Sequence, residues 1–406
     1  MKQLIQTSYG KGVFVIIWFK HNNLMILESL DLPKMYNLES FSTEIGLSIT
    51  IIYLLSQKQD KFYHQVMIPK TKSGHRILSI PSISMKIVQK WIKVKILDKI
   101  PISNCAMAFR KGSSYGIKTN AELHKYNTYI LRLDLKDFFN NIKREKVFYL
   151  FSQIGYNNYI SNILSNICTF NGVLPQGGVT SPSISNLICK RLDRRLENLA
   201  SKRDITYTRY ADDLIFSCND EVLLIKTKNA ILDILKSEGM EINKLKTKFI
   251  RPGSRKKITG LHIDKNKVVV PRDTKRKFRA MIHYAIVTGD YSKSDEIKGY
   301  ISFISSIEEN YMSKIKAYIN KIVNNEQYRL FADIVESYNE NKIFKDLETM
   351  SRIEEVDEIE EDILNEYFYN RVDFLEQYGL KEVIEKFTDY EDHIVTTCLD
   401  YENCPF

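Results

Sequence analysis

Proline, glycine and long apolar runs are all scarce in this sequence. Its 406 residues include only 9 Pro and 16 Gly, and 44% of the residues are hydrophobic and 27% charged. This balance argues against a fibrous or largely disordered chain and indicates an ordinary globular protein. A chain of this length can bury a full core and is expected to hold two or three subdomains.

Paired cysteines are also absent. The six cysteines form no CxxC pair and lie mostly within apolar runs, so we expect buried free thiols in a reducing compartment and no zinc site. The apolar run 13–19 is only seven residues long, too short to span a bilayer. A signal peptide is the weaker alternative, because no small-residue cleavage site clearly follows this run. These features predict a cytoplasmic protein with no membrane partner.

The formal charge of +9 is unevenly distributed along the chain. Residues 331–406 hold 6 Lys and Arg against 22 Asp and Glu, a net charge of −16. Residues 1–330 hold the other 53 basic and 28 acidic residues, a net charge of +25. An excess of this size suits a surface that binds a polyanion such as nucleic acid. A lysine-rich surface from an AT-rich genome is the alternative reading of charge alone.

Apolar periodicity predicts an interleaved order of helices and strands, and therefore an α+β fold. Helices are expected over 42–56, 84–100, 143–154, 182–199, 221–238, 272–287 and 295–323. Strands or extended segments are expected over 62–68, 76–80, 128–133, 205–210, 214–218, 240–243, 247–250, 257–264 and 267–270. The strands 205–210 and 214–218 flank an acidic turn, which predicts a hairpin with carboxylates at its tip.

Three carboxylates stand at strand ends and can converge on one point. Asp212 and Asp213 occupy the predicted hairpin turn, and Asp134 follows the apolar strand 128–133. Transfer of a nucleotide to a 3′-hydroxyl needs two metal ions about 4 Å apart, and hard carboxylate oxygens suit Mg²⁺. An Asp-Asp turn alone is more often a solvated β-turn. The neighbouring motifs reverse that preference.

These motifs resemble those of the reverse transcriptase family over roughly residues 40–325. Residues 132–139 (RLDLKDFF) match motif A, residues 174–182 (LPQGGVTSP) match motif B, and residues 210–213 (YADD) match motif C. The resemblance implies an RNA-directed DNA polymerase in which Asp134, Asp212 and Asp213 are catalytic and hold two Mg²⁺ ions. An RNA-dependent RNA polymerase would usually have Ser-Gly where motif B has Gln176 and Gly177.

The same resemblance implies a right-hand polymerase with fingers, palm and helical thumb. An antiparallel sheet with helices would form the palm, and an acidic helical extension would follow the thumb. The expected units are an N-terminal extension 1–37, fingers with a subfamily-specific segment 38–127, palm 128–256, primer grip and thumb 257–330, and the acidic extension 331–406.

The resemblance also assigns residues to the incoming nucleotide. The segment 68–76 (IPKTKSGHR) matches the fingers hairpin, where Arg76 and either Lys70 or Lys72 would grip the triphosphate. Cations are needed there because Mg²⁺ only partly neutralises that group. Three further positions follow from motifs A, B and D. They are Phe139 against the sugar 2′ position, Gln176 beside the nucleotide, and Lys246 at the leaving pyrophosphate.

Two short motifs indicate the bacterial retron enzymes within this family. Residues 120–124 (NAELH) match the NAxxH motif, and residues 258–260 (ITG) stand where retron enzymes usually have VTG. A satisfied helix-terminal pair is the alternative for the first motif. The positions expected to bind RNA or DNA, including those of the basic helix after the primer grip, are Asn120, His124, Thr259, Gly260, Arg272, Lys275, Arg276 and Lys277.

A retron enzyme implies definite partners. It would bind a structured noncoding RNA encoded beside it, take dNTPs, and make multicopy single-stranded DNA joined to the RNA through a 2′ branch. Anti-phage defence with a toxic effector protein would be its role. The alternatives are another bacterial defence reverse transcriptase making protein-primed or repetitive DNA, a group II intron maturase, or a catalytically silent RNA-binding scaffold. Three mutually repelling carboxylates argue against the scaffold.

Overall fold

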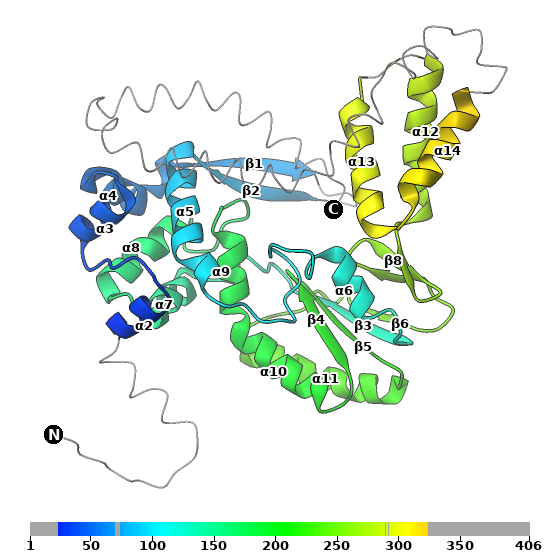
Figure 1. Ribbon diagram of the computed structural model, residues 1–406. Coiled ribbons are helices and arrows are strands. Elements are labelled where there is room, and N and C mark those ends of the chain that lie inside the picture. Colours follow the sequence, from blue (N-terminus) through cyan, green and yellow to red (C-terminus); the bar gives the residue numbers. More distant parts are fainter. Residues whose placement is uncertain (1–22, 70–73, 289, 291, 324–406) are drawn as a thin grey trace.

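A computed structural model describes residues 23–69, 74–288, 290 and 292–323. In this part of the chain, helices combine with three antiparallel sheets, and the expected α+β class is confirmed. Figure 1 shows a helical region around α5 and α8 at one end, a sheet with two long helices in the middle, and three helices at the other end. Residues 1–22 of the expected N-terminal extension (1–37) and the whole acidic extension (331–406) lie outside the described residues.

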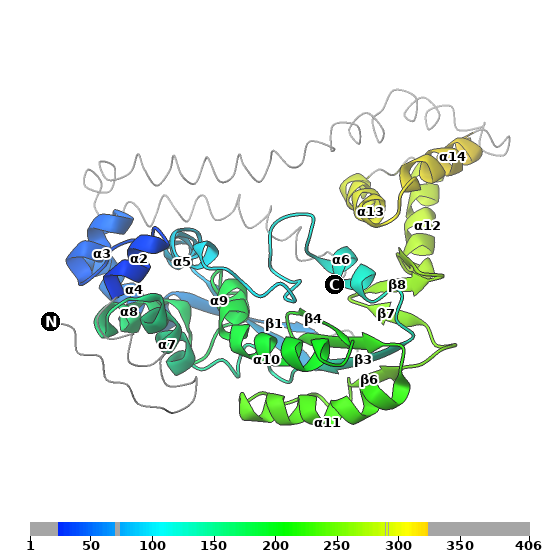
Figure 2. The ribbon, with the colours of Figure 1, turned by 60° about the horizontal axis from the view of Figure 1, so that its bottom comes forward.

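The central sheet carries the acidic turn. Its strand order is β4-β5-β3-β6, and Figure 2 shows α10 and α11 beside it. The other two sheets are a long hairpin, β1 with β2, and a three-stranded sheet, β7-β8-β9. The strands are β1 (Tyr63–Pro69), β2 (His75–Pro81), β3 (Tyr129–Asp134), β4 (Thr206–Tyr210), β5 (Asp213–Cys218), β6 (Lys248–Ile250), β7 (Lys256–Ile258), β8 (Leu261–Asp264) and β9 (Lys267–Val269).

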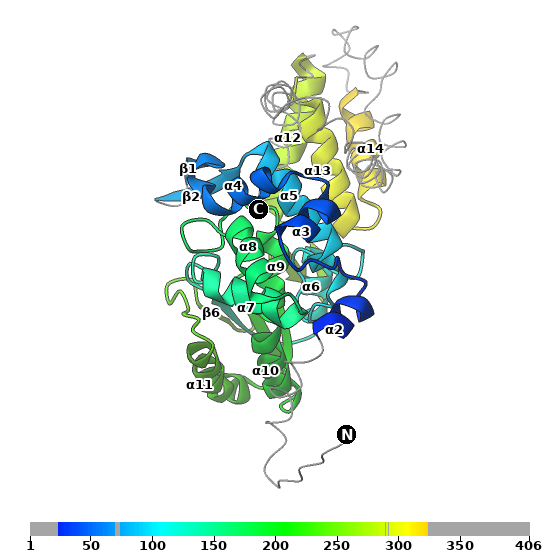
Figure 3. The ribbon, with the colours of Figure 1, turned by 90° about the vertical axis from the view of Figure 1, so that its left-hand side faces the viewer.

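The helices group around these sheets, as the side view in Figure 3 shows. Their bounds are α2 (Asn23–Ser29), α3 (Leu38–Ile45), α4 (Ile49–Gln57), α5 (Ile83–Lys95), α6 (Ile117–Leu123), α7 (Arg144–Ile154), α8 (Asn158–Cys168), α9 (Ser181–Ile188), α10 (Lys190–Ser201), α11 (Glu221–Ser237), α12 (Arg272–Thr288), α13 (Ser294–Ile307) and α14 (Tyr311–Val323). Short 3₁₀ turns are η2 (Gln59–Lys61) and η3 (Leu97–Lys99).

Two hydrophobic cores meet across the central sheet. On β3, Leu131 and Leu133 face a core shared with the N-terminal helices, whereas Ile130 faces a second core shared with α12, α13 and α14. On β5, Phe216 lies in the first core and Ile215 in the second. Because successive strand residues point to opposite faces, the adjacent apolar residues of β3 and β5 bury both faces of the sheet. The strands that bear the aspartates are therefore held from both sides.

Several element boundaries differ from the sequence-based expectation. The helix expected over 42–56 is two helices, because Gly46 ends α3 in the left-handed conformation (φ 74°) and its N–H bonds the Ser42 carbonyl. The helix expected over 295–323 also divides, between α13 and α14, near Asn310 (φ 61°). The segment 257–264 bends at Gly260 (φ 84°) and forms two strands instead of one. Helix α8 was not expected at all.

No single helix in the described ranges is long and apolar enough to cross a membrane. Helices α3 and α4 pass such a test only as a pair bent by 106°. The described cysteines, Cys105, Cys168, Cys189 and Cys218, are free and buried.

Candidate active site

The register of the central sheet brings the three aspartates together. Asp134 at the end of β3 is the cross-strand partner of Asp213 at the start of β5. Asp212 lies in the turn before β5, and its carbonyl accepts a hydrogen bond of 2.9 Å from the Leu135 N–H. The turn is tight because Ala211 adopts the left-handed conformation, with φ 52°. Sequence reasoning anticipated this convergence from the strand ends alone.

Cations already contact two of these carboxylates. Arg132 donates two hydrogen bonds to Asp213, of 3.0 Å and 2.6 Å. Lys246, whose side chain is 61% exposed, lies 3.1 Å from Asp134. The expected motif D lysine therefore reaches Asp134, while Arg132 was not singled out from the sequence. Its place two residues before Asp134, on the same face of β3, was the available signal.

Burial and mutual repulsion disfavour the charged form of the third carboxylate. The pKa of Asp212 is raised to about 6, first by burial and then by the charges of Asp213 and Asp134. The pKa of Asp213 is also raised by burial, although Arg132 opposes that shift. A cation bound between these groups would relieve both penalties.

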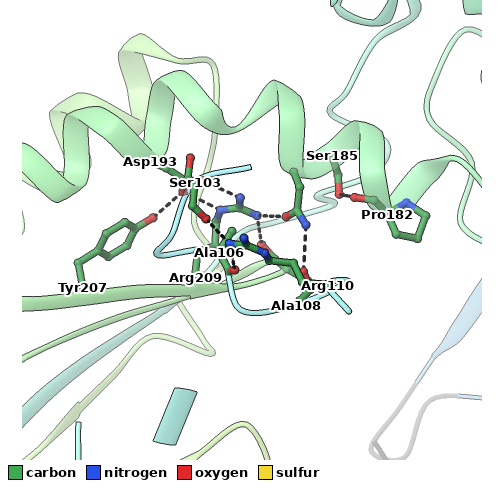
Figure 4. Close-up of polar contacts among 11 residues, drawn as sticks. Ser103, Ala106, Ala108, Arg110, Pro182, Ser185, Asp193, Tyr207 and Arg209 are labelled. Atoms are coloured by element: carbon green, nitrogen blue, oxygen red, sulfur yellow. Dashed lines mark hydrogen bonds and ion pairs between the residues drawn. The ribbon is translucent and has the colours of Figure 1, made fainter. Parts of the chain in front are cut away.

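A buried ion pair contacts the acidic turn that carries Ala211, Asp212 and Asp213, which we call the catalytic turn. Arg209 and Asp193 are fully buried and joined by two hydrogen bonds of 2.7 Å. Arg209 also reaches the Ala211 carbonyl at 3.3 Å and the side chain of Asn186 at 3.0 Å. Figure 4 shows this cluster between the helix that carries Asp193 and the strand that carries Tyr207. It connects α9 and α10, the helices that follow motif B, to motif C, and the sequence analysis did not anticipate it.

The same cluster reaches the segment in front of the expected sugar pocket. Asn186 donates a hydrogen bond of 2.9 Å to the Ala108 carbonyl, one residue before Phe109. The ring of Phe109, which is 44% exposed, lies 6.4 Å from the half-buried ring of Phe139. The structure thus places Phe139 in an aromatic pair with Phe109, and Asp137, two residues before Phe139, adopts the left-handed conformation (φ 43°).

Motif B packs against the hairpin of β1 and β2, which the sequence analysis assigned to the fingers. The Gln176 carbonyl accepts a hydrogen bond of 2.7 Å from the Ser79 N–H of β2. A Cβ on Gly177 would lie 2.9 Å from the Ser79 carbonyl oxygen, and its φ of 105° also favours glycine. The buried Gln89 of α5 accepts a further hydrogen bond of 3.0 Å from the Val179 N–H. Arg76 is exposed on β2, whereas Lys70 and Lys72 lie outside the described residues.

The residues expected to bind nucleic acid fall into two groups. Arg272, Arg276 and Lys277 are exposed on or at the start of α12, and Lys275 forms an ion pair of 2.7 Å with Glu308. Gly260 is exposed in the turn before β8. By contrast, the buried side chains are those of Asn120 (0% exposed), His124 (0%) and Thr259 (8%). These three offer almost no surface to RNA in this structure, and their binding role stays an untested prediction.

Comparison with known proteins identifies the family. The model of the family described as "Reverse transcriptase (RNA-dependent DNA polymerase)" matches residues 68–282, just over half of the chain. The chain belongs to the reverse transcriptase family. It is 37% identical to the Retron Ec86 reverse transcriptase of Escherichia coli, over 74% of this chain and 93% of that relative.

Other retron enzymes match this reverse transcriptase more distantly. It is 31% identical to the Retron Mx65 reverse transcriptase of Myxococcus xanthus, over 62% of this chain and 64% of that protein. A solved structure of telomerase from Candida albicans aligns with a TM-score of 0.43 and 12% identity, over 70% of this chain and 59% of that one. The expected retron type and RNA-directed DNA polymerase activity are confirmed.

Reverse transcriptases use divalent metal ions, so the carboxylates must suit one. As their side chains stand, no group of three or more His, Cys, Asp or Glu among the described residues is arranged to hold a metal ion. Two of the aspartates are instead turned to Arg132 and Lys246. The donor chemistry nevertheless fits a hard cation, because all three ligands are carboxylates. A cation bound at Asp134 would compete with Lys246 for that carboxylate.

Proposed function

We propose that this reverse transcriptase copies a structured noncoding RNA into single-stranded DNA that stays joined to the RNA through a branch. Two Mg²⁺ ions would be held by Asp134, Asp212 and Asp213. The observation that carries this proposal is the convergence of these carboxylates at one end of the central sheet. The match to a retron relative, which covers 93% of that relative, supports it. Its place would be the cytoplasm, where its thiols stay reduced.

The side chains around the carboxylates would divide the work of nucleotide addition. When bound, the two ions lower the pKa of the attacking hydroxyl and neutralise the leaving pyrophosphate. The side chain of Lys246 is exposed beside Asp134. It would move away from Asp134 and stabilise the leaving pyrophosphate. Arg76, with Lys70 or Lys72, would hold the triphosphate. Phe139 would close against the sugar 2′ position, with Gln176 beside the nucleotide.

The exposed basic residues at the start of α12 would bind the nucleic acid. Arg272, Arg276 and Lys277 face outward and would contact the phosphate backbone, which fixes register without reading sequence. We retain the division into fingers (38–127), palm (128–256) and thumb (257–330). An effector protein and a role in anti-phage defence remain predictions from the retron resemblance, as does any part played by the acidic extension 331–406.

The test is to purify the protein with its native locus and to sequence the bound nucleic acid after separate RNase and DNase digestion. A defined RNA joined by a 2′,5′ branch to single-stranded DNA is expected. Repetitive DNA, or DNA linked to protein, would overturn the retron product and favour the wider group of defence reverse transcriptases.

A variant pair separates catalysis from binding. Asp212→Asn with Asp213→Asn should abolish DNA synthesis while RNA still copurifies, because the carboxylates act on the metal rather than on the RNA. Asp233→Asn, an exposed change on α11, is the matched control and should leave synthesis unchanged. DNA synthesis by the double variant would refute the metal assignment.

A further inference from the structure

A continuous row of buried hydrogen bonds joins the two motifs that the retron resemblance singled out. Asn120 of the NAxxH motif donates to the Thr259 hydroxyl of the ITG motif at 3.4 Å. The Thr208 hydroxyl of β4 donates to Asn120 Oδ1 at 2.5 Å, and His124 Nε2 lies 2.7 Å from the same hydroxyl. His124 Nδ1 lies 2.6 Å from the Ser217 hydroxyl of β5. We call this row the polar clasp.

Donor and acceptor counts give the polar clasp one direction. The Thr208 hydroxyl has a single proton, which it donates to Asn120, so it must accept from His124 Nε2–H. His124 Nδ1 then accepts from Ser217, whose oxygen in turn accepts from Asn127 Nδ2 at 2.7 Å. This order needs a neutral imidazole. Burial agrees, because it lowers the pKa of His124 to about 3.

Thr259, at the far end of the polar clasp, has a strained backbone conformation. Thr259 has a φ of 42°, in the left-handed region that a β-branched residue rarely adopts. Such a conformation persists only where the surroundings fix it. The Thr259 hydroxyl accepts from Asn120 and donates to the Ile117 carbonyl at 3.4 Å. The side chain is thus held by α6 on both sides of its oxygen.

The two ends of the polar clasp belong to different working parts. Thr208 and Ser217 lie on β4 and β5, whose connecting turn carries Asp212. Thr259 lies in the turn between β7 and β8, the hairpin expected to grip the primer. Helix α6 contacts β4 on one side and β7, β8 and β9 on the other, and Figure 1 shows it between the two sheets. The polar clasp therefore connects the two sheets through α6.

We propose that Asn120, His124, Thr208 and Thr259 are positioning residues that set the primer-grip hairpin relative to the catalytic turn. The retron-specific motifs would then act on the geometry of the primer end from inside the protein, and not by touching RNA. This inference rests on the proposed polymerase site and on the primer-grip role of β7 and β8. It does not depend on which RNA is the natural template.

The experiment uses the full chain, Mg²⁺ and a poly(rA) template with an oligo(dT) primer, which contains no retron RNA. Thr208→Val keeps the shape of the side chain and removes its hydroxyl, and Thr259→Gly removes the hydroxyl while relieving the left-handed strain. Each should slow single-turnover addition of dTTP by about tenfold. The Kd values for dTTP and for the primer-template should change by less than about twofold.

Three controls make this result specific to position. Thr259→Ser keeps the hydroxyl and should retain the parent rate. Thr227→Val removes a buried hydroxyl that bonds only the Leu223 carbonyl of its own helix, and it should lower stability without slowing addition. The double variant Thr208→Val with Thr259→Gly should be at most about twofold slower than the slower of the two single variants. Either single substitution already breaks the polar clasp, so the two effects should not add.

Other results would overturn the proposal. Parent-like rates for both Thr208→Val and Thr259→Gly, with weaker retention of the native RNA, would show that the motifs recognise RNA directly. Equal slowing by Thr227→Val would reduce the effect to general destabilisation. Failure of the native RNA to yield branched DNA would refute the proposed product, yet the rates on poly(rA) would still decide the clasp.

Discussion

The buried pair of Arg209 and Asp193 offers a test of how the catalytic turn is supported. Both side chains are 0% exposed, and Arg209 donates to both carboxylate oxygens at 2.7 Å. Tyr207 adds a hydrogen bond of 3.1 Å to the same carboxylate. Arg209→Met would leave a buried carboxylate with Tyr207 alone. Breaking such a pair from one side costs about 3–5 kcal/mol, so the variant should unfold at much lower urea concentration.

Removing both charges should cost far less. In Arg209→Met with Asp193→Leu, no uncompensated charge stays buried, and replacement of a buried pair by apolar residues is often nearly neutral. Urea unfolding followed by circular dichroism should therefore show the double variant to be more stable than Arg209→Met. Nucleotide addition should stay slow in both, because neither variant can donate the 3.3 Å hydrogen bond from residue 209 to the Ala211 carbonyl.

The outcome that would refute this reasoning is additivity. If the losses of stability in Arg209→Met and Asp193→Leu simply add in the double variant, the two side chains do not act as a unit. Parent-like nucleotide addition by a folded double variant would show instead that Arg209 does not hold the turn.

Three further predictions concern the site. Phe139→Ala should raise the incorporation of ribonucleotides relative to deoxynucleotides by at least about tenfold, measured by single-nucleotide extension. Arg276→Gln with Lys277→Gln should lower the slope of log Kd against log salt for duplex binding by about 0.9 for each phosphate that the protein no longer neutralises, whereas Lys275→Gln, which is already ion-paired, should lower it less. Because the pKa of Asp212 is raised to about 6, a proton competes with the metal below that pH. The Mg²⁺ concentration for half-maximal addition should then rise by up to about tenfold per pH unit as the pH falls below 6, and an unchanged requirement would contradict the shift.

Much of the central sheet could be predicted because its signals are local. The strands next to Asp134 and Asp213 are largely apolar, and the acidic turn between 205–210 and 214–218 predicts the pairing of β4 with β5. Convergence of the carboxylates follows from strand direction alone. Helix α8 was not predicted, although its apolar residues follow a helical period.

The support of the site was harder to predict because it depends on contacts distant in sequence. An arginine is among the residues least often buried, so Arg209 is expected at the surface until Asp193 and Asn186 are placed beside it. The same holds for Gln89, whose hydrogen bond to the Val179 N–H spans 90 positions. Neither partner is implied by the spacing of apolar residues.

The retron-specific motifs show that a polar motif allows two interpretations from sequence. The retron resemblance predicts that Asn120 and His124 bind RNA, and that prediction stays untested, yet a buried polar group is equally well explained by a protein partner. A signal for the second interpretation was present. Thr206 and Thr208 stand two apart on one strand, with Ser217 opposite Thr206 on the next, so three hydroxyls recur on one face of the sheet. A row of hydroxyls facing an interior requires donors and acceptors from a neighbouring element, and the NAxxH helix supplies both.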